Sequence, residues 1–195
     1  METHAGKNSQ SPYRIVTAMS KTSLYIQKHQ ELQYYLSAKG WDAVISPADN
    51  VQPYERIIVN IYNDDQTLFW PAELLFLPGL EKDMHEYSIL QCYIPMAANV
   101  PGGMTIALSD MITRINTKLA LGAFGLLEEH HVLFYKHNIL LQDEQVNAQF
   151  PVIHQCLLMA SYLLLHFQEA FVHVITGRMS VQEAMKQMPL SKVYK

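Results

Sequence analysis

The sequence contains little charge and little cysteine. Asp, Glu, Lys and Arg make up 16% of the 195 residues, well below the roughly 25% of an average domain, and four of them are arginines. Nucleic-acid-binding domains usually gather Lys and Arg into one basic patch, so a chain with a net charge of −4 and no basic cluster is not expected to bind nucleic acid. Cys92 and Cys156 stand far apart, which predicts no disulfide framework and favours a reducing compartment.

The sequence also has little that would direct it to a membrane or out of the cell. Residues 1–12 are polar and small, so we expect a flexible tail there rather than a secretory signal. The most apolar stretch, Val152–Ile175, is interrupted by His, Gln and Glu side chains, whereas a transmembrane helix needs roughly 20 mostly apolar residues in a row. We therefore expect a cytoplasmic protein without a membrane span.

Sequence motifs of the common catalytic and phosphate-binding types are missing. Gly102-Gly103 has neither the dinucleotide-binding nor the Walker spacing, and there is no nucleophile elbow of the G-x-S-x-G type. Cys156 is two residues from His154 in a predicted helix, where such side chains point in different directions. The acidic pairs Asp64-Asp65 and Glu128-Glu129 fall in predicted turns, which face solvent. These absences predict a non-enzymatic protein with no catalytic residue and no cofactor.

The sequence contains nine histidines, which leave metal binding as an alternative. His130 and His131 are adjacent in a predicted turn, and His137 follows on the next strand. Imidazole is the commonest metal ligand in proteins, but a site needs three or four converging donors, and no H-E-x-x-H or paired-cysteine spacing is present. We expect no metal site; the alternative is a metal-dependent or small-molecule-binding enzyme that uses this hairpin.

Helix patterns begin and end the main part of the chain. Apolar residues at three- and four-residue steps predict a helix from Ser20 to Gly40, where glycine suits a left-handed C-terminal cap. A second helix is expected to be capped by Ser109 or Asp110 and to end at Gly122.

Two further helices are predicted near the C-terminus. Pro151 suits the first turn of a long helix that ends at Thr176-Gly177. Ser180 and Glu183 have the spacing of a capping box, which predicts a short helix up to Met188.

Strand patterns occur between the first predicted helix and the long one. Residues 55–62, 67–77 and 86–94 are rich in β-branched and aromatic side chains and are separated by turn signals, which predicts three consecutive antiparallel strands. Residues 123–127 and 132–141 predict a hairpin. Strands in runs, with few helices between them, favour an α+β fold with an antiparallel sheet of five strands, in the order α-βββ-α-ββ-α plus a short C-terminal helix, and with the helices on one face.

The expected domain organisation follows from this order. Residues 1–12 are expected to form the flexible tail, residues 13–177 a single α+β domain, and residues 178–195 a C-terminal helix and tail. A single domain of this size can bury a core without disulfides.

Two predicted elements carry more apolar residues than one buried face requires. The long predicted helix is apolar around most of its circumference, although a helix on a sheet needs one apolar stripe. The strand at 67–77 is apolar on both faces, and ten methionines supply adaptable surface. A thick core is one explanation; a protein-binding surface is the one we favour. The candidate partner contacts on these two elements are Phe69, Leu74, Phe76, Tyr162 and His166.

The predicted order resembles the fold shared by type III secretion chaperones and bacterial YbjN-like proteins. The resemblance covers about residues 20–177 and is strongest over residues 112–141, where a helix ends in glycine and a hairpin carries a short acidic turn before a long helix. This chain is longer than the secretion chaperones, through residues 44–80 and the C-terminal helix, and it is mildly acidic.

The resemblance implies a non-enzymatic protein. Such chaperones form dimers that hold a secretion substrate against apolar grooves and sheet edges, and adaptor subunits of type IV secretion complexes are a related class. We therefore expect a chaperone-like adaptor, a homodimer or part of a hetero-complex, whose partner is a secretion substrate or a secretion-complex subunit, bound on apolar surface or by strand addition.

Overall fold

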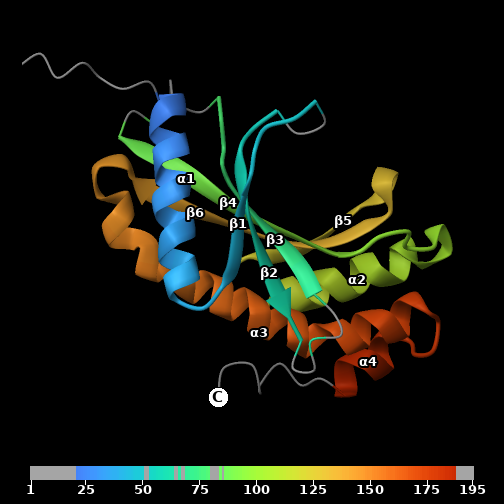
Figure 1. Ribbon diagram of the computed structural model, residues 1–195. Coiled ribbons are helices and arrows are strands. Elements are labelled where there is room, and N and C mark those ends of the chain that lie inside the picture. The colour runs from blue at the N-terminus through green and yellow to red at the C-terminus, as the bar shows by residue number, and fades with distance from the viewer. Residues whose placement is uncertain are drawn as a thin grey trace, which may run out of the picture.

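A computed structural model describes residues 21–50, 53–63, 66, 69–79, 84 and 86–187, with the side chains of residues 21–23 and 69 left out. The predicted tail at 1–12, the turn at Asp64-Asp65 and the end of the chain from Met188 lie outside these residues. The described chain folds as α+β, with one antiparallel sheet and α-helices packed against it (Figure 1).

The helices and strands follow one another as three groups. The first comprises α1 (Lys21–Ala38) and the strands β1 (Asp42–Ser46), β2 (Arg56–Tyr62), β3 (Phe69–Phe76) and β4 (Tyr87–Ala97). The second comprises the short 3-10 helix η1 (Gly102–Met104), α2 (Thr105–Asn116), β5 (Ala123–Leu127), the turn η2 (Glu128–His130) and β6 (Val132–Gln142). The third comprises η3 (Asp143–Gln149), α3 (Phe150–Ile175) and α4 (Val181–Gln187).

The described sheet has six strands, not five. Its order is β1-β2-β3-β4-β6-β5, and every neighbouring pair is antiparallel. The strand that the sequence did not reveal is β1, which has five residues between Gly40 and Pro47. β1 begins with a charged residue and buries one side chain, Ala43, so it shows no clear apolar alternation. It is held in place by its pairing with β2 rather than by its own pattern.

The second helix is also displaced from its expected bounds. It begins at Thr105, directly after η1, and ends at Asn116, whereas Gly122 lies in the connection to β5 with φ of 67°. Asp110, expected as a cap, instead lies inside α2 and pairs with Arg114 one turn later, at 2.8 Å.

The terminal helix signals are confirmed. Pro151 lies in the first turn of α3. Ser180 and Glu183 form the capping box of α4: the Ser180 backbone N–H donates to the Glu183 carboxylate at 2.8 Å, and the Glu183 N–H donates to Ser180 Oγ at 3.3 Å. Val181 and Ala184 are buried, so α4 packs onto the same core as the rest of the chain.

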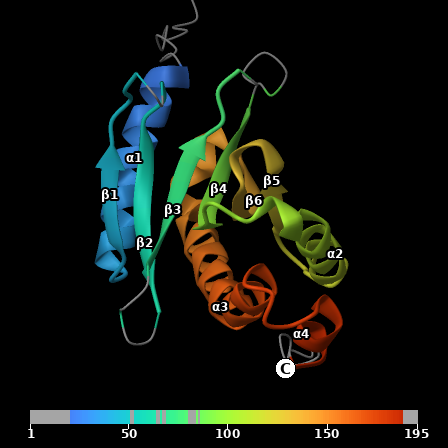
Figure 2. The same ribbon diagram turned by 90° about the vertical axis from the view of Figure 1, so that its right-hand side faces the viewer.

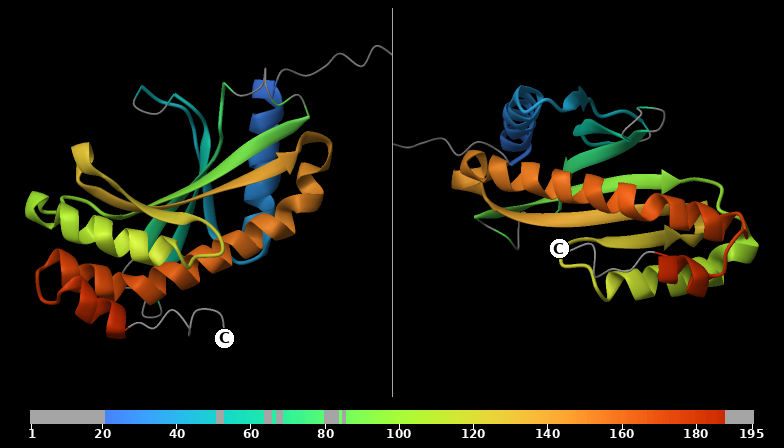
Figure 3. Two further views of the ribbon diagram at one scale, coloured as in Figure 1. Left: turned by 180° about the vertical axis from the view of Figure 1, so that it is seen from behind. Right: turned by 90° about the horizontal axis from the view of Figure 1, so that it is seen from below.

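The helices cover one face of the sheet. In Figure 2, α1 lies behind β1 and β2 at one end, and α2 accompanies β5 at the other. Seen from below, α3 crosses the sheet between α1 and α2 (Figure 3, right). Alternate side chains of each strand point into this layer, for example Ile57, Val59 and Ile61 of β2, and form one continuous core with the helices.

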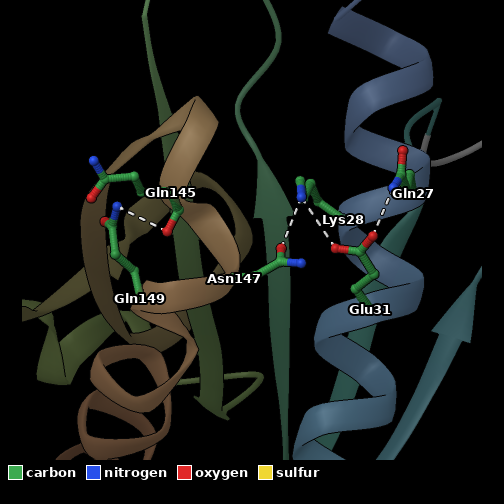
Figure 4. A network of polar contacts seen from close by, with 6 residues as sticks. All are labelled: Gln27, Lys28, Glu31, Gln145, Asn147 and Gln149. Carbon is green, nitrogen blue, oxygen red and sulfur yellow. Dashed lines mark hydrogen bonds and ion pairs between the residues drawn. The ribbon is translucent and has the colours of Figure 1, made fainter.

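A polar network fastens α1 to η3, which leads into α3 (Figure 4). Lys28 Nζ donates to Asn147 Oδ1 at 2.8 Å and lies 3.1 Å from Glu31, which also accepts from Gln27 at 2.7 Å. Burial alone would raise the pKa of Glu31, but the hydrogen bonds from Gln27, Lys28 and Asn147 outweigh it and hold that pKa below its usual value. The network therefore joins α1 to η3 through the Lys28–Asn147 hydrogen bond.

Candidate interaction surface

The face of the sheet turned away from the helices carries a mixture of apolar and charged side chains. We call this surface the outer sheet face. Its apolar side chains include Val44, Ile58, Leu75, Ile89, Tyr93, Phe134 and Leu140, and its polar or charged side chains include Asp42, Arg56, Asn60, Glu73, Gln91, Lys136 and Asn138. Leu140 is 58% exposed and Val44 is 51% exposed, so apolar side chains reach solvent on both sides of the sheet's middle.

An aromatic pair occupies the centre of the outer sheet face. The rings of Tyr93 on β4 and Phe134 on β6 lie 5.2 Å apart. In the register, Tyr93 stands between Glu73 on β3 and Lys136 on β6. Burial, followed by the negative charge of Glu73, raises the pKa of Tyr93, so its hydroxyl stays neutral and can donate a hydrogen bond.

The ion pair Arg56–Glu73 borders this centre. Arg56 Nε lies 3.4 Å from a Glu73 carboxylate oxygen, and both side chains are partly shielded from solvent. The face carries two cationic side chains, Arg56 and Lys136, and two anionic side chains, Glu73 and Asp42. Their formal charges cancel. The outer sheet face therefore resembles a protein interface, in which aromatic anchors are surrounded by polar groups.

At each edge of the sheet, one residue has its backbone hydrogen-bonded by a side-chain amide from a helix. On β1, Gln33 Nε2 of α1 donates to the Ala43 carbonyl at 2.9 Å. On β5, Asn116 at the end of α2 pairs with both backbone groups of Phe124. A strand added at either position would have to displace these amides.

The long helix α3 is only partly enclosed. Ten of its residues are buried, among them Leu163, Leu164 and Phe167. On its other side Val152, Leu158, Tyr162 and Val172 are 42–53% exposed; we call these four residues the α3 ridge. The excess of apolar surface expected for this helix is therefore present on one side of it.

The five side chains expected to contact a partner do not form one surface. Leu74 and Phe76 are core residues, 0% and 2% exposed, because register with β2 and β4 turns them inward. Tyr162 is exposed and stacks on half-buried His166, with ring centroids 5.9 Å apart. The backbone of Phe69 pairs with Tyr62 in the sheet, and its side chain lies outside the description.

The histidine hairpin does not converge. His130 and His131 are exposed at the turn between β5 and β6, whereas His137 faces the core side of β6, opposite Cys92. His131 and His137 are six positions apart along the chain, which in a strand corresponds to about 20 Å. Among the residues that the structure describes, no three or more His, Cys, Asp or Glu side chains are grouped as metal ligands would be.

An apolar cavity of about 270 Å³ adjoins the α3 ridge. Its walls are mostly apolar and include Trp70, Met96, Leu133, Phe171 and Val172. Gln168 is a polar residue of the lining. It lies where β4 bulges between Pro95 and Ala97. The cavity would accept an apolar side chain, but it carries no pair of groups suited to proton transfer.

Among the described residues, the helical stretch Asp143–Ile175, which comprises η3 and α3, is long and apolar enough to cross a membrane. This is weak evidence, because the core helix of a soluble protein passes the same test. Comparison of the chain with protein-family models, with curated proteins and with solved structures finds no match.

Proposed function

We propose that this protein is a non-enzymatic, chaperone-like adaptor of the cytoplasm that binds a protein partner on its outer sheet face. One observation carries the proposal: the described helices pack on one face of the sheet, while the opposite face has the Tyr93–Phe134 pair at its centre. Exposed apolar side chains lie farther out on the same face, with Val44 on the edge strand β1 and Leu140 opposite Ile89 on β6. Large apolar areas left in contact with water usually mark a surface that a partner covers.

The composition of the outer sheet face favours a polypeptide as the bound molecule. Tyr93 offers a large ring and a neutral hydroxyl, which is the type of residue that carries most of the energy in protein interfaces. The balanced charges of Arg56, Glu73 and Lys136 give the face no preference for a strongly acidic or strongly basic ligand. Such a face suits a partner surface that combines apolar anchors with a few complementary charges.

The kind of partner follows from the resemblance to secretion chaperones and remains part of the proposal. It would be a secretion substrate or a secretion-complex subunit, bound by a homodimer or within a hetero-complex. The alternative, an enzyme built on His130, His131 and His137, would need these side chains to meet, and their positions on β6 and at the turn keep them apart.

The test compares one substitution on each face. Leu140→Glu places a charge on the outer sheet face, at the position of β6 that pairs with Ile89, whereas Ile106→Glu places the same charge on α2, where Ile106 is 86% exposed. The oligomeric state of the purified chain is measured by light scattering. Any protein that copurifies is identified, purified and titrated against wild type and both variants.

We expect Leu140→Glu to weaken the association by about tenfold or more, because a buried unpaired charge is strongly unfavourable at an interface. Ile106→Glu should leave it unchanged. A wild-type chain that stays monomeric and has no titratable partner contradicts the proposal, as does an equal response of the two variants.

A further inference from the structure

A second cavity, of about 360 Å³, opens away from the centre of the outer sheet face. It lies between the first half of α1, the segment just before β2 and the end of β3. Its walls are mostly apolar or aromatic and include Tyr25, Ile26, Tyr54, Leu75 and Phe76. A volume near the lower end of the range for small-molecule sites accommodates one or two rings.

The walls of this cavity are held in place by ring stacking. Tyr25 of α1 stacks on Phe76 of β3, with centroids 4.9 Å apart and planes 6° from parallel. The Tyr25 hydroxyl is tied to Ser88 of β4 at 3.3 Å. The aromatic walls are therefore fixed by two strands and a helix, as a preformed binding site requires.

One polar side chain, His29 of α1, lines the cavity and is almost fully buried. It is 2% exposed, and its ring lies 5.1 Å from that of Phe76. Nδ1 is 3.2 Å from a carboxylate oxygen of Glu55. Because a carboxylate only accepts hydrogen bonds, Nδ1 carries the proton in the neutral ring, and Nε2 is left as an acceptor.

No group of the described residues forms a hydrogen bond with the acceptor Nε2, although this atom is buried. A buried polar atom is nearly always satisfied in a folded protein, by the protein itself or by a bound molecule. His29 is one of the residues that line the aromatic cavity, and its Nε2 is an unsatisfied acceptor. Together these two features point to a ligand that brings a hydrogen-bond donor.

We propose that this cavity binds a neutral aromatic ring that carries an O–H or N–H group, and that the group donates its hydrogen bond to Nε2 of His29. The aromatic walls select the ring. Glu55, the charged residue of the lining, disfavours carboxylates and phosphates. The ring can belong to a free phenol or indole, or to a tyrosine or tryptophan side chain of a bound polypeptide.

The probes are chosen to differ by one group. Binding of p-cresol, toluene and p-toluate to the full chain is measured by isothermal titration or by ligand-observed NMR. We expect p-cresol to bind about tenfold more tightly than toluene, which has the same ring but no donor, and p-toluate to bind no better than toluene. An acetylated Gly-Tyr-Gly amide forms a fourth arm: tighter binding of the peptide assigns the site to a partner side chain, and tighter binding of p-cresol assigns it to a free ligand.

Two variants test the role of His29. His29→Phe keeps a ring of similar size but removes the acceptor, so p-cresol and toluene should bind equally. His130→Phe, at an exposed position in the turn before β6, is the matched control and should preserve the difference. In the wild-type chain, p-cresol should also shift the ¹⁵N resonance of His29 Nε2, a readout that needs no variant.

The inference is overturned if wild type binds none of the four probes, or if p-cresol and toluene bind equally. It is also overturned if p-cresol leaves the Nε2 resonance unmoved. The cavity shares Leu75 with the outer sheet face, but these outcomes measure binding of the probes and not association through that face. The adaptor proposal is therefore tested separately by Leu140→Glu.

Discussion

The side chain of Asn116 makes the two hydrogen bonds that a neighbouring strand would otherwise make with the backbone of Phe124. Its Oδ1 accepts the Phe124 N–H at 2.9 Å, and its Nδ2 donates to the Phe124 carbonyl at 2.8 Å. Both free backbone groups of this residue at the β5 edge are thereby satisfied, which removes a template for pairing with another chain. The last residue of α2 thus protects the sheet and also joins the helix to it.

Asn116→Ala should open this edge. Loss of two partly buried hydrogen bonds is expected to lower the free energy of unfolding by about 1–3 kcal/mol, and the Phe124 amide should exchange faster with solvent. Chemical denaturation and hydrogen exchange measure the two effects. Asn116→Asp retains an acceptor for the N–H and loses the donor, so an effect as large as that of Asn116→Ala would contradict the bidentate role.

A second prediction concerns Gly125 of β5, over which the ring of Phe134 lies. A methyl group added at Gly125 would overlap that ring, so Gly125→Ala should destabilise the fold by about 1–3 kcal/mol through overpacking. Thermal or chemical unfolding measures the change. Gly102→Ala is the control, because nothing lies near its added methyl group.

The double variant Gly125→Ala/Phe134→Leu separates packing from backbone effects. A smaller side chain at 134 should relieve the overlap, so the two substitutions together should cost less than the sum of their separate effects. Strict additivity would mean that the Phe134 ring is not what makes glycine necessary at this position.

The sequence predicts the elements whose patterns are long or sharply bounded. The α+β class, the meander, the β5–β6 hairpin and the capping box of α4 are confirmed, because each has a local cause such as a turn or a capping side chain. The strand β1 was missed because partners outside its five residues create it. The start of α2 was missed because η1 begins the helix four residues before the expected cap at Ser109.

The functional surface is less readable from the sequence. On the strand β3, Leu74 and Phe76 alternate with Glu73 and Leu75, and only the register with β2 and β4 decides which set enters the core. The pair His29–Glu55 spans 26 residues, and no local pattern announces it. A more regular alternation on β3 would have identified the buried set, as it does on β2.

The two cysteines should differ in reactivity. Burial raises the pKa of Cys92 to about 12 and also raises the pKa of half-buried Cys156. Since the thiolate is the reactive form, native protein at pH 8 should be alkylated slowly at Cys156 and scarcely at Cys92. Mass spectrometry after timed iodoacetamide treatment measures both sites, and Cys156→Ser isolates Cys92. Labelling of Cys92 in native protein as fast as in urea would contradict its burial.

Acid should destabilise the protein through His29. Burial lowers the pKa of His29 below its ordinary value of 6.5, more than the hydrogen bond and charge of Glu55 raise it. Below pH 6.5 the unfolded chain therefore takes up a proton that the folded chain resists, and the free energy of unfolding falls as the pH decreases. Above that pH both states are neutral at this residue and the contribution is constant.

The slope that His29 adds is at most about 1.4 kcal/mol per pH unit. His137 adds to it in the same direction, because burial lowers its pKa as well. Urea denaturation between pH 4.5 and 7.5 should therefore give a shallower slope for His29→Phe than for wild type, with His137 accounting for part of the remainder. Parallel curves for wild type and His29→Phe would show that His29 is protonated equally easily in the folded and unfolded chains, and the neutral ring facing the second cavity would then lose its physical basis.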